Sequence, residues 1–466
     1  MRRQSLLWMY HPTNIYTTMG FGCIIQSGVN MINTKAVIAI AVVAILAMGG
    51  IGVAIYNMGD NGGNNVTIDS VLPVYGNANN DDRIDQADID ILNDIINGKK
   101  KAEDYPLANA KYDDNDKIDQ EDIEQVKAII NKTATSVWHV NTIGTKQNAT
   151  ESKWPITSAL CTATPNVAAF LVMLGITDKI AAVSYGATSQ PDHVMMPEMK
   201  TKFAKSIGKS TGITYDQASP YITSDGVSAV ITSTNATYMA NYEDMEAHNI
   251  DVIRIDATGP SAKEFLSAVI FLGFMFDKND NVQKIVDMTN KIYNAVNKGL
   301  DKVEKKVVAM ASNTTGSLTA PSSDYTKLLK AAGAEIPDDK RWTGTIKMST
   351  ADWIYDVTVN KVVCMRTSGG IGGVWYAGTH NDTTIKGVFD AYNKMDAYKN
   401  NEIYMINGEL PMPLRLAYVA QVLYPEQFNS DFADKFNADW CKDIYGLNLD
   451  FSKLNTIYKV SDYKAA

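Results

Sequence analysis

Residues 227–257, VSAVITSTNATYMANYEDMEAHNIDVIRIDA, have the pattern of two strands with a helix between them. The runs at 227–233 and 251–257 are apolar and rich in β-branched residues, which is typical of buried strands. Comparable runs lie at 179–185, 307–312 and 361–367. Strands that alternate with helical patterns predict an α/β fold with largely parallel sheets.

A long amphipathic stretch divides this region into two halves. Between Asp280 and Lys306 the apolar residues recur at helical spacing and stay on one face. We therefore expect one long helix over 280–306, which joins an N-terminal lobe (137–279) to a C-terminal lobe (307–466). Each lobe is predicted to be Rossmann-like.

An internal repeat with an offset of 34 residues precedes the lobes. DRIDQADIDILNDIIN (82–97) aligns with DKIDQEDIEQVKAIIN (116–131), and each copy has the pattern of a 12-residue calcium loop followed by one helix. The oxygen ligands expected in the first loop are Asn77, Asn79, Asp81, the Arg83 carbonyl, Asp85 and Asp88. Those of the second are Asp113, Asn115, the Lys117 carbonyl, Asp119 and Asp122. Because Lys111 replaces the first ligand of the second loop, we expect that site to be weaker.

The duplicated loop and helix, with Asp at position 12, resembles a type I dockerin domain over 67–135. The resemblance implies a small all-α, EF-hand-like module that binds Ca2+ and docks onto a cohesin-bearing protein. Residues 67–133 hold 16 Asp and Glu against 8 Lys and Arg, a net charge of −8 that favours bound cations. An acidic helical hairpin without metal is the alternative.

The segment before the module predicts a membrane anchor. Residues 36–56, AVIAIAVVAILAMGGIGVAIY, are 21 uncharged residues, and at about 1.5 Å each they span a hydrocarbon core of roughly 30 Å. We favour a single uncleaved transmembrane helix over a cleaved signal peptide. Lys35 before it and Asp60 after it place the bulk of the chain outside the cell membrane. Residues 1–35 have the character of a leader that includes a mis-assigned start, and residues 57–66 that of a linker.

The two lobes and their connecting helix resemble ABC-transporter substrate-binding proteins of the iron-siderophore and cobalamin class, the class III periplasmic-binding family. The resemblance covers about residues 137–460 and is carried by TPNVAAFLVMLGITDKIAAVS (164–184), YEDMEAHNIDVIRI (242–255), LPMPLRLAYVAQVLYPEQF (410–428) and DWCKDIYGLN (439–448). It implies a binder, not an enzyme, that captures an iron complex, corrinoid or similar metal chelate for an ABC permease. Ala168 and Ala169 stand where the family carries a permease-docking Glu, so this chain departs from the family there.

The ligand is expected at the carboxyl ends of the strands, where open α/β sheets bind their ligands. The candidate ligand-binding residues are Thr164, Asn166, Tyr185, Thr234, Asn235, Asn313, Arg366, Ser368, Trp375 and Tyr376. Arg366 is the strongest single candidate, because it ends an apolar strand and its guanidinium suits a carboxylate or phosphate. A surface arginine is the alternative for Arg366, and core packing is the alternative for the two aromatic residues.

Other function classes find little support in the sequence. The net charge of −9, with only seven Arg, disfavours nucleic-acid binding. There is no H-E-x-x-H zinc motif and no G-x-S-x-G nucleophile motif, and GGIGG (369–373) lacks the Lys-Ser/Thr of a phosphate-binding loop. A cohesin-docked surface enzyme or adhesin that acts on polysaccharide remains the rival interpretation.

Overall fold

The computed structural model describes residues 68–112, 117–163, 166–184, 205–208, 211–259, 261–366 and 381–464. The predicted leader, membrane anchor and linker lie outside these residues. Among the helices that are described, none is long and apolar enough to cross a membrane.

The N-terminal lobe contains a four-stranded parallel sheet with the order β4-β3-β5-β6. Its strands are β3 (Ala159–Cys161), β4 (Ile180–Val183), β5 (Ala229–Ser233) and β6 (Asp251–Ile255). Its helices are α4 (Asn166–Met173), α7 (Tyr215–Asp225), α8 (Tyr242–Glu246) and α9 (Ala262–Met275). The strand, helix and strand predicted for 227–257 are therefore β5, α8 and β6.

The C-terminal lobe contains a second four-stranded sheet with the order β12-β11-β10-β7. Strands β7 (Ala309–Ser312), β10 (Lys361–Arg366) and β11 (Ile403–Asn407) are parallel, and β12 (Tyr458–Lys459) is an antiparallel edge strand. The helices are α11 (Asp324–Ala331), α12 (Asp382–Asp390), α13 (Asp396–Lys399), α14 (Met412–Leu423) and α15 (Phe432–Asp443). A small antiparallel pair, β8 (Ser317–Leu318) and β9 (Ile346–Lys347), completes the lobe.

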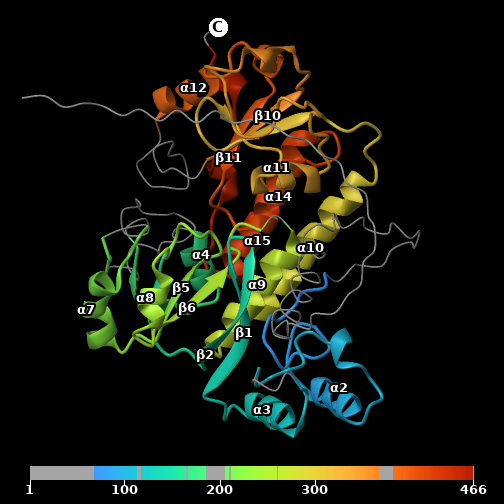
Figure 1. The fold of residues 1–466 in the computed structure, drawn as a ribbon. Helices are drawn as coiled ribbons and strands as arrows, with labels where there is room; N and C mark the ends of the chain where they lie inside the picture. The colour runs from blue at the N-terminus through green and yellow to red at the C-terminus, as the bar shows by residue number, and fades with distance from the viewer. Residues whose placement is uncertain are drawn as a thin grey trace, which may run out of the picture.

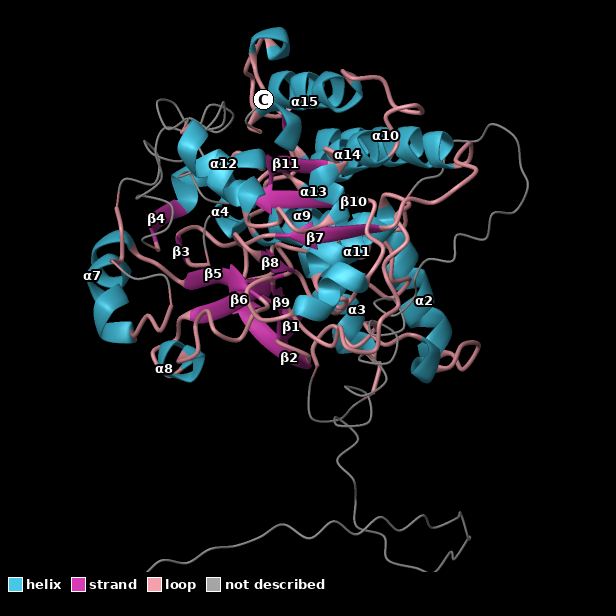
Figure 2. Ribbon diagram, turned by 90° about the horizontal axis from the view of Figure 1, so that it is seen from above, coloured by secondary structure: helices cyan, strands magenta, loops and turns pink. Residues whose placement is uncertain are grey.

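One long helix, α10 (Val282–Leu300), joins the two lobes (Figure 1). It lies within the predicted 280–306 and ends six residues earlier. Its apolar face, which includes Ile285, Ile292 and Val296, is buried against α9 and α14. All twelve residues of α14 are buried, and α10 and α14 lie side by side in Figure 2. One apolar core therefore runs through both lobes along these helices.

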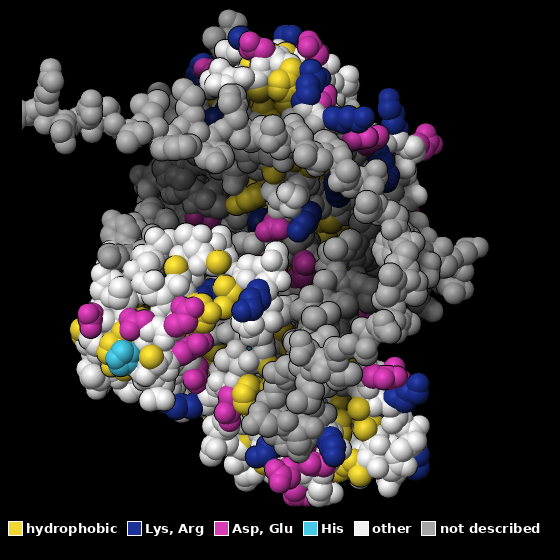
Figure 3. All heavy atoms as spheres, viewed as in Figure 1, with side chains coloured by type: hydrophobic (Ala, Val, Ile, Leu, Met, Phe, Trp, Pro, Cys, Tyr) yellow, Lys and Arg dark blue, Asp and Glu magenta, His cyan; other side chains and the backbone are white. Residues whose placement is uncertain are grey.

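The acidic repeat forms two short helices, α2 (Gln86–Ile96) and α3 (Gln120–Ile130), which pack through Ile89, Leu92, Ile123 and Val126. Acidic side chains gather on this module, at the bottom of Figure 3. A hairpin of β1 (Ser136–Ile143) and β2 (Lys146–Lys153) follows the module and lies against β6. The sequence analysis did not predict this hairpin, because β2, KQNATESK, is polar and has no apolar alternation.

Candidate functional site

The carboxyl ends of the N-terminal strands carry Thr234 and Asn235, as predicted. Both follow β5. The backbone N–H of Thr234 donates to the Ile255 carbonyl of β6, and the Asn235 side-chain oxygen accepts from the N–H of Thr237 at 2.9 Å. These contacts fix the turn after β5. Thr234 also lines a cavity of about 280 Å3 between this turn, the β1–β2 hairpin, α9 and the acidic module.

The C-terminal lobe presents its strand ends in the same way. Asn313 directly follows β7, and Arg366 is the last residue of β10, paired in register with Asn407 of β11. Only the backbone of Arg366 and of Asn166, the first residue of α4, is described. The other predicted ligand residues, Thr164, Tyr185, Ser368, Trp375 and Tyr376, lie outside the described residues.

Three buried polar residues that the sequence analysis missed lie at the end of β11 and in the segment that follows it. Asn407 ends β11 and accepts the N–H of Glu409 at 2.8 Å, and burial raises the pKa of the Glu409 carboxyl to about 8. Arg415 lies in the first turn of α14 with only 9% of its surface exposed. A signal for Arg415 was present, because it is the one charged residue in the otherwise apolar segment LPMPLRLAYVAQVL.

Arg415 is a buried cation with unused hydrogen-bonding capacity. Burial lowers the pKa of its guanidinium, while Tyr325 and Asp324 of α11 oppose that shift electrostatically. Its Nε has no hydrogen-bond partner within the part of the chain that the structure describes. A buried guanidinium is costly unless its N–H groups are satisfied.

Acidic side chains also lie at the seam between the lobes. Thr258, in the loop after β6, donates its Oγ1 to the Asp324 carboxylate at 3.0 Å and so links the two lobes directly. Asp256 lies beside it and is partly buried, and this burial, together with the charges of Glu264 and Asp324, raises the pKa of Asp256 to about 6. Charged groups of both lobes therefore meet at the carboxyl ends of the strands.

In the first acidic loop Asn79 is hydrogen-bonded to both Asp81 and Asp88, whereas Asp85 caps the helix that follows. Asp85 is the N-cap of α2 and accepts the N–H of Ala87, and Asp88 accepts the N–H groups of Asp85 at 2.8 Å and Asn79 at 3.1 Å. Asp88 is fully buried, and this burial, with a contribution from the charge of Asp81, raises the pKa of its carboxyl to about 6. Asp81 and Asp88 are therefore close enough to repel each other.

Two other residues of this loop face different partners. The Asn77 amide donates to the carbonyls of Leu72 and Asp81 at 2.8 and 2.7 Å, so it braces the loop. The N–H of Arg83 donates to Asp81, and its side chain forms an exposed ion pair with Asp82.

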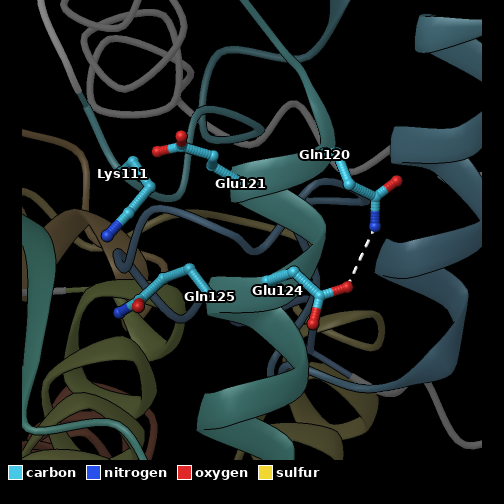
Figure 4. A pocket seen from close by; sticks show the side chains of 5 residues that line it. All are labelled: Lys111, Gln120, Glu121, Glu124 and Gln125. Carbon is cyan, nitrogen blue, oxygen red and sulfur yellow. Dashed lines mark hydrogen bonds between the residues drawn. The ribbon is translucent and has the colours of Figure 1, made fainter.

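The second loop repeats the cap geometry. Asp119 is the N-cap of α3, and Asp122 accepts the N–H groups of Asp119 and Lys111. Lys117 is described, whereas Asp113 and Asn115 are not. Lys111 and the α3 residues Gln120, Glu121, Glu124 and Gln125 line a surface cavity of about 330 Å3, in which Gln120 donates to Glu124 at 2.9 Å (Figure 4).

The first loop has the chemistry that a hard cation requires. Within the described residues, no three His, Cys, Asp or Glu side chains converge as a metal site, so a full shell would need Asn79 and backbone carbonyls as well. All of these donors are oxygen atoms, which suits Ca2+. Among the described ion pairs, none supplies a cation to the buried Asp88. By the type of their donor atoms these residues suit a bound Ca2+.

Comparisons with known proteins identify the fold of the lobes. No family model matches the chain, and no curated protein matches it. The solved structure of the molybdate-binding protein MolA of Haemophilus influenzae is similar, with a TM-score of 0.52 and 15% identity over 67% of this chain and 99% of that one. The TroA-like periplasmic binding protein FepB of Veillonella parvula has a TM-score of 0.50 and 13% identity over 68% and 99% of the two chains. CeuE of Helicobacter pylori, solved with Ni(II) bound, has a TM-score of 0.50 and 12% identity over 66% and 97%.

The lobes have the fold of a periplasmic solute-binding protein. The similar structures of MolA and FepB are each that of a periplasmic binding protein. They are almost fully covered by the match, whereas about a third of this chain lies outside it. The solute-binding fold therefore accounts for the two lobes, in agreement with the resemblance noted in the sequence.

Proposed function

We propose that this chain is an extracytoplasmic solute-binding protein of an ABC importer, which captures an iron complex, a corrinoid or a similar metal chelate through an anionic group of that ligand. The observation that carries the proposal is Arg415, a buried guanidinium with an unbonded Nε at the seam between two lobes of solute-binding fold. An anionic ligand group would satisfy the free N–H and offset the cost of the buried charge.

The surroundings of Arg415 favour an anion further. Arg415 lies in the first turn of α14, where the helix dipole places partial positive charge. Arg366 is the last residue of the neighbouring strand β10, where its backbone pairs in register with Asn407 of β11. The chain would thus direct two of its seven Arg to the same end of the C-terminal sheet. The molybdate named for MolA is itself an oxyanion, which supports an anionic group on the ligand of this chain.

We further propose that residues 36–56 anchor the chain in the cell membrane and that the acidic module binds Ca2+ and docks onto a cohesin-bearing protein. Asn79, Asp81, Asp85 and Asp88 would hold the ion, and its charge would compensate the buried Asp88 carboxylate. The repeat and its oxygen donors support this part of the proposal, which is independent of the ligand in the lobes. Docking to a permease would use surfaces other than the one at Ala168 and Ala169.

The experiment is a binding survey by thermal unfolding and calorimetry with ferric siderophores, haem, cobalamin, molybdate and oligosaccharides. A ligand that binds only the folded protein at 100 times its dissociation constant should add about 2.7 kcal/mol of stability. We expect this from a metal chelate, and we expect Arg415→Met to weaken it at least tenfold, a loss of about 1.4 kcal/mol.

The matched control is Arg341→Met, because Arg341 is exposed and bonded to Asp339. The more conservative Arg415→Lys variant separates a folding defect from a binding defect, since it keeps the charge but loses the planar fork. Stabilisation by oligosaccharides alone would instead favour a cohesin-docked surface enzyme or adhesin, and equal binding by Arg415→Met and Arg341→Met would remove Arg415 from the site.

A further inference from the structure

The acidic module is built into the N-terminal lobe. Its first segment, residues 68–76, pairs with the lobe's hairpin: the N–H of Tyr75 donates to the Trp138 carbonyl and the N–H of Val140 donates to the Pro73 carbonyl, at 2.8 and 2.9 Å. Val74 forms a bridge with His139 of β1. The segment is therefore joined to β1 by an isolated antiparallel bridge.

The same segment is bonded to two helices of the lobe. The N–H of Val71 donates to Ser267 Oγ of α9 at 3.0 Å, and the N–H of Ile68 donates to Asn290 Oδ1 of α10 at 2.9 Å. Leu72 and Val74, both buried, belong to the apolar core that runs through the two lobes. Segment 68–76 is thus held by the helix that joins the lobes.

The other side of the segment is bonded to the first acidic loop. The N–H of Leu72 donates to the Asp81 carbonyl at 2.8 Å, and the Asn77 amide donates to the carbonyls of Leu72 and Asp81. Asp81 is also one of the loop carboxylates, close to Asp88. Leu72 therefore contacts the loop through its backbone and the lobe core through its side chain.

We propose that a divalent cation in the first loop regulates the solute-binding lobe through segment 68–76. A cation that draws Asp81 and Asp88 together fixes the backbone of Asp81, which holds Leu72 and with it the attachment to α9 and α10. This inference rests on the proposed binding of Ca2+ to the loop. If the loop and the lobe are coupled, a cation that stabilises the ordered loop also stabilises the N-terminal lobe. The acidic module would then act on its own lobe as well as on any partner protein.

The first part of the experiment measures Ca2+ binding and lobe protection separately in the full-length chain in detergent. Calorimetry with CaCl2 against EGTA measures binding, and hydrogen exchange measures protection of the peptides that contain β1, the first turns of α9 and the middle of α10. We expect Ca2+ to slow exchange in these peptides about tenfold, because their opening is coupled to that of the loop. Peptides of α12 and α13, which lie far along the C-terminal lobe, serve as the internal reference.

The second part uses a variant that cuts the attachment and leaves the loop intact. Ser267→Ala with Asn290→Ala removes both side-chain acceptors of the segment. The matched control is Ser219→Ala with Gln283→Ala, because the hydrogen bonds described for those side chains stay within their own helices. We expect the first pair to bind Ca2+ but to lose the added protection in α9 and α10, and the control pair to keep it.

The outcomes distinguish the linkage from the binding on which it rests. If Ca2+ binds and the lobe peptides exchange at unchanged rates, the linkage is wrong and the calcium module stands. If Ca2+ does not bind at all, both are wrong. If the Ser267/Asn290 variant keeps the full added protection, the coupling does not pass through segment 68–76 and the proposal is overturned.

Discussion

Gly76→Ala is the substitution that most directly tests the packing of the acidic module. Gly76 immediately precedes the first loop and has φ +103°, a conformation that residues with a Cβ rarely adopt. A Cβ placed there would lie 3.0 Å from Val126 Cγ2 and 3.2 Å from Ala110 Cβ, two buried side chains of the module. The substitution therefore adds backbone strain and overpacking at the same point.

The expected loss follows from these two terms. Strained backbone at a non-glycine residue costs about 1–3 kcal/mol, and an added methyl group in a packed core costs about 1–3 kcal/mol. We therefore expect Gly76→Ala to lower the free energy of unfolding by about 2–4 kcal/mol, because the neighbours give way partly. Gly98→Ala is the control: Gly98 also has a positive φ, +68°, but no atom lies within 4 Å of its Cβ position. It should lose only the backbone term.

Urea unfolding followed by Trp fluorescence and far-UV circular dichroism measures both variants. Val126→Ala should cost less in the Gly76→Ala background than in the unmodified protein, since it removes the atom at 3.0 Å. Equal losses for Gly76→Ala and Gly98→Ala, or an equal cost of Val126→Ala in both backgrounds, would refute the packing of α3 against Gly76.

Three further predictions concern pH and capping. Burial raises the pKa of Glu409 to about 8, above its value in the unfolded chain. The stability that the protonated Glu409 contributes is therefore present at pH 4 and is lost as the pH rises towards 8. Glu409→Gln should flatten the dependence of the free energy of unfolding on pH, measured from pH 4 to 9. Burial lowers the pKa of His139 to about 4, so the stability that the neutral imidazole contributes is present above pH 6.5 and is lost as the pH falls through 4. His139→Asn should therefore reduce the loss of unfolding free energy at acid pH, and an unchanged loss would contradict the role of His139. Asp119 caps α3, and Asp119→Ala should cost about 1 kcal/mol, whereas Asp119→Asn should cost much less if capping is its role in the absence of calcium.

The elements with a regular local pattern of apolar residues could be predicted from the sequence. β5, β6, β7 and β10 are apolar runs that are buried on both faces, and α10 has a regular apolar stripe, so local periodicity was sufficient. β3 has only three residues and β2 is polar, so neither has the periodic spacing of apolar residues from which a strand is predicted. β1 lies beside β6 partly through the Asn141 side chain, which bonds the backbone of Val252 and Arg254.

The attachment of the module to the lobe could not be predicted for a different reason. Its hydrogen bonds join residues that are 196 and 222 positions apart, Val71 with Ser267 and Ile68 with Asn290. Ser and Asn on helices are usually ordinary surface residues, so nothing local marks these two as acceptors. Such contacts emerge only when the whole chain has folded.

The candidate ligand site shows the same division between local and global information. Arg366 was predicted because a charged residue at the end of an apolar strand is a local signal, and β10 does end at that residue. Arg415 lies in helix α14, so no strand end marks it in the sequence. The structure shows that α14 follows β11, and that Asn407, the last residue of β11, is paired in register with Arg366. Since α14 contacts both β10 and β11, the two residues belong to one end of the C-terminal lobe. An anion held there would contact α14, the helix that also packs on α10, so ligand binding would reach the connecting helix directly.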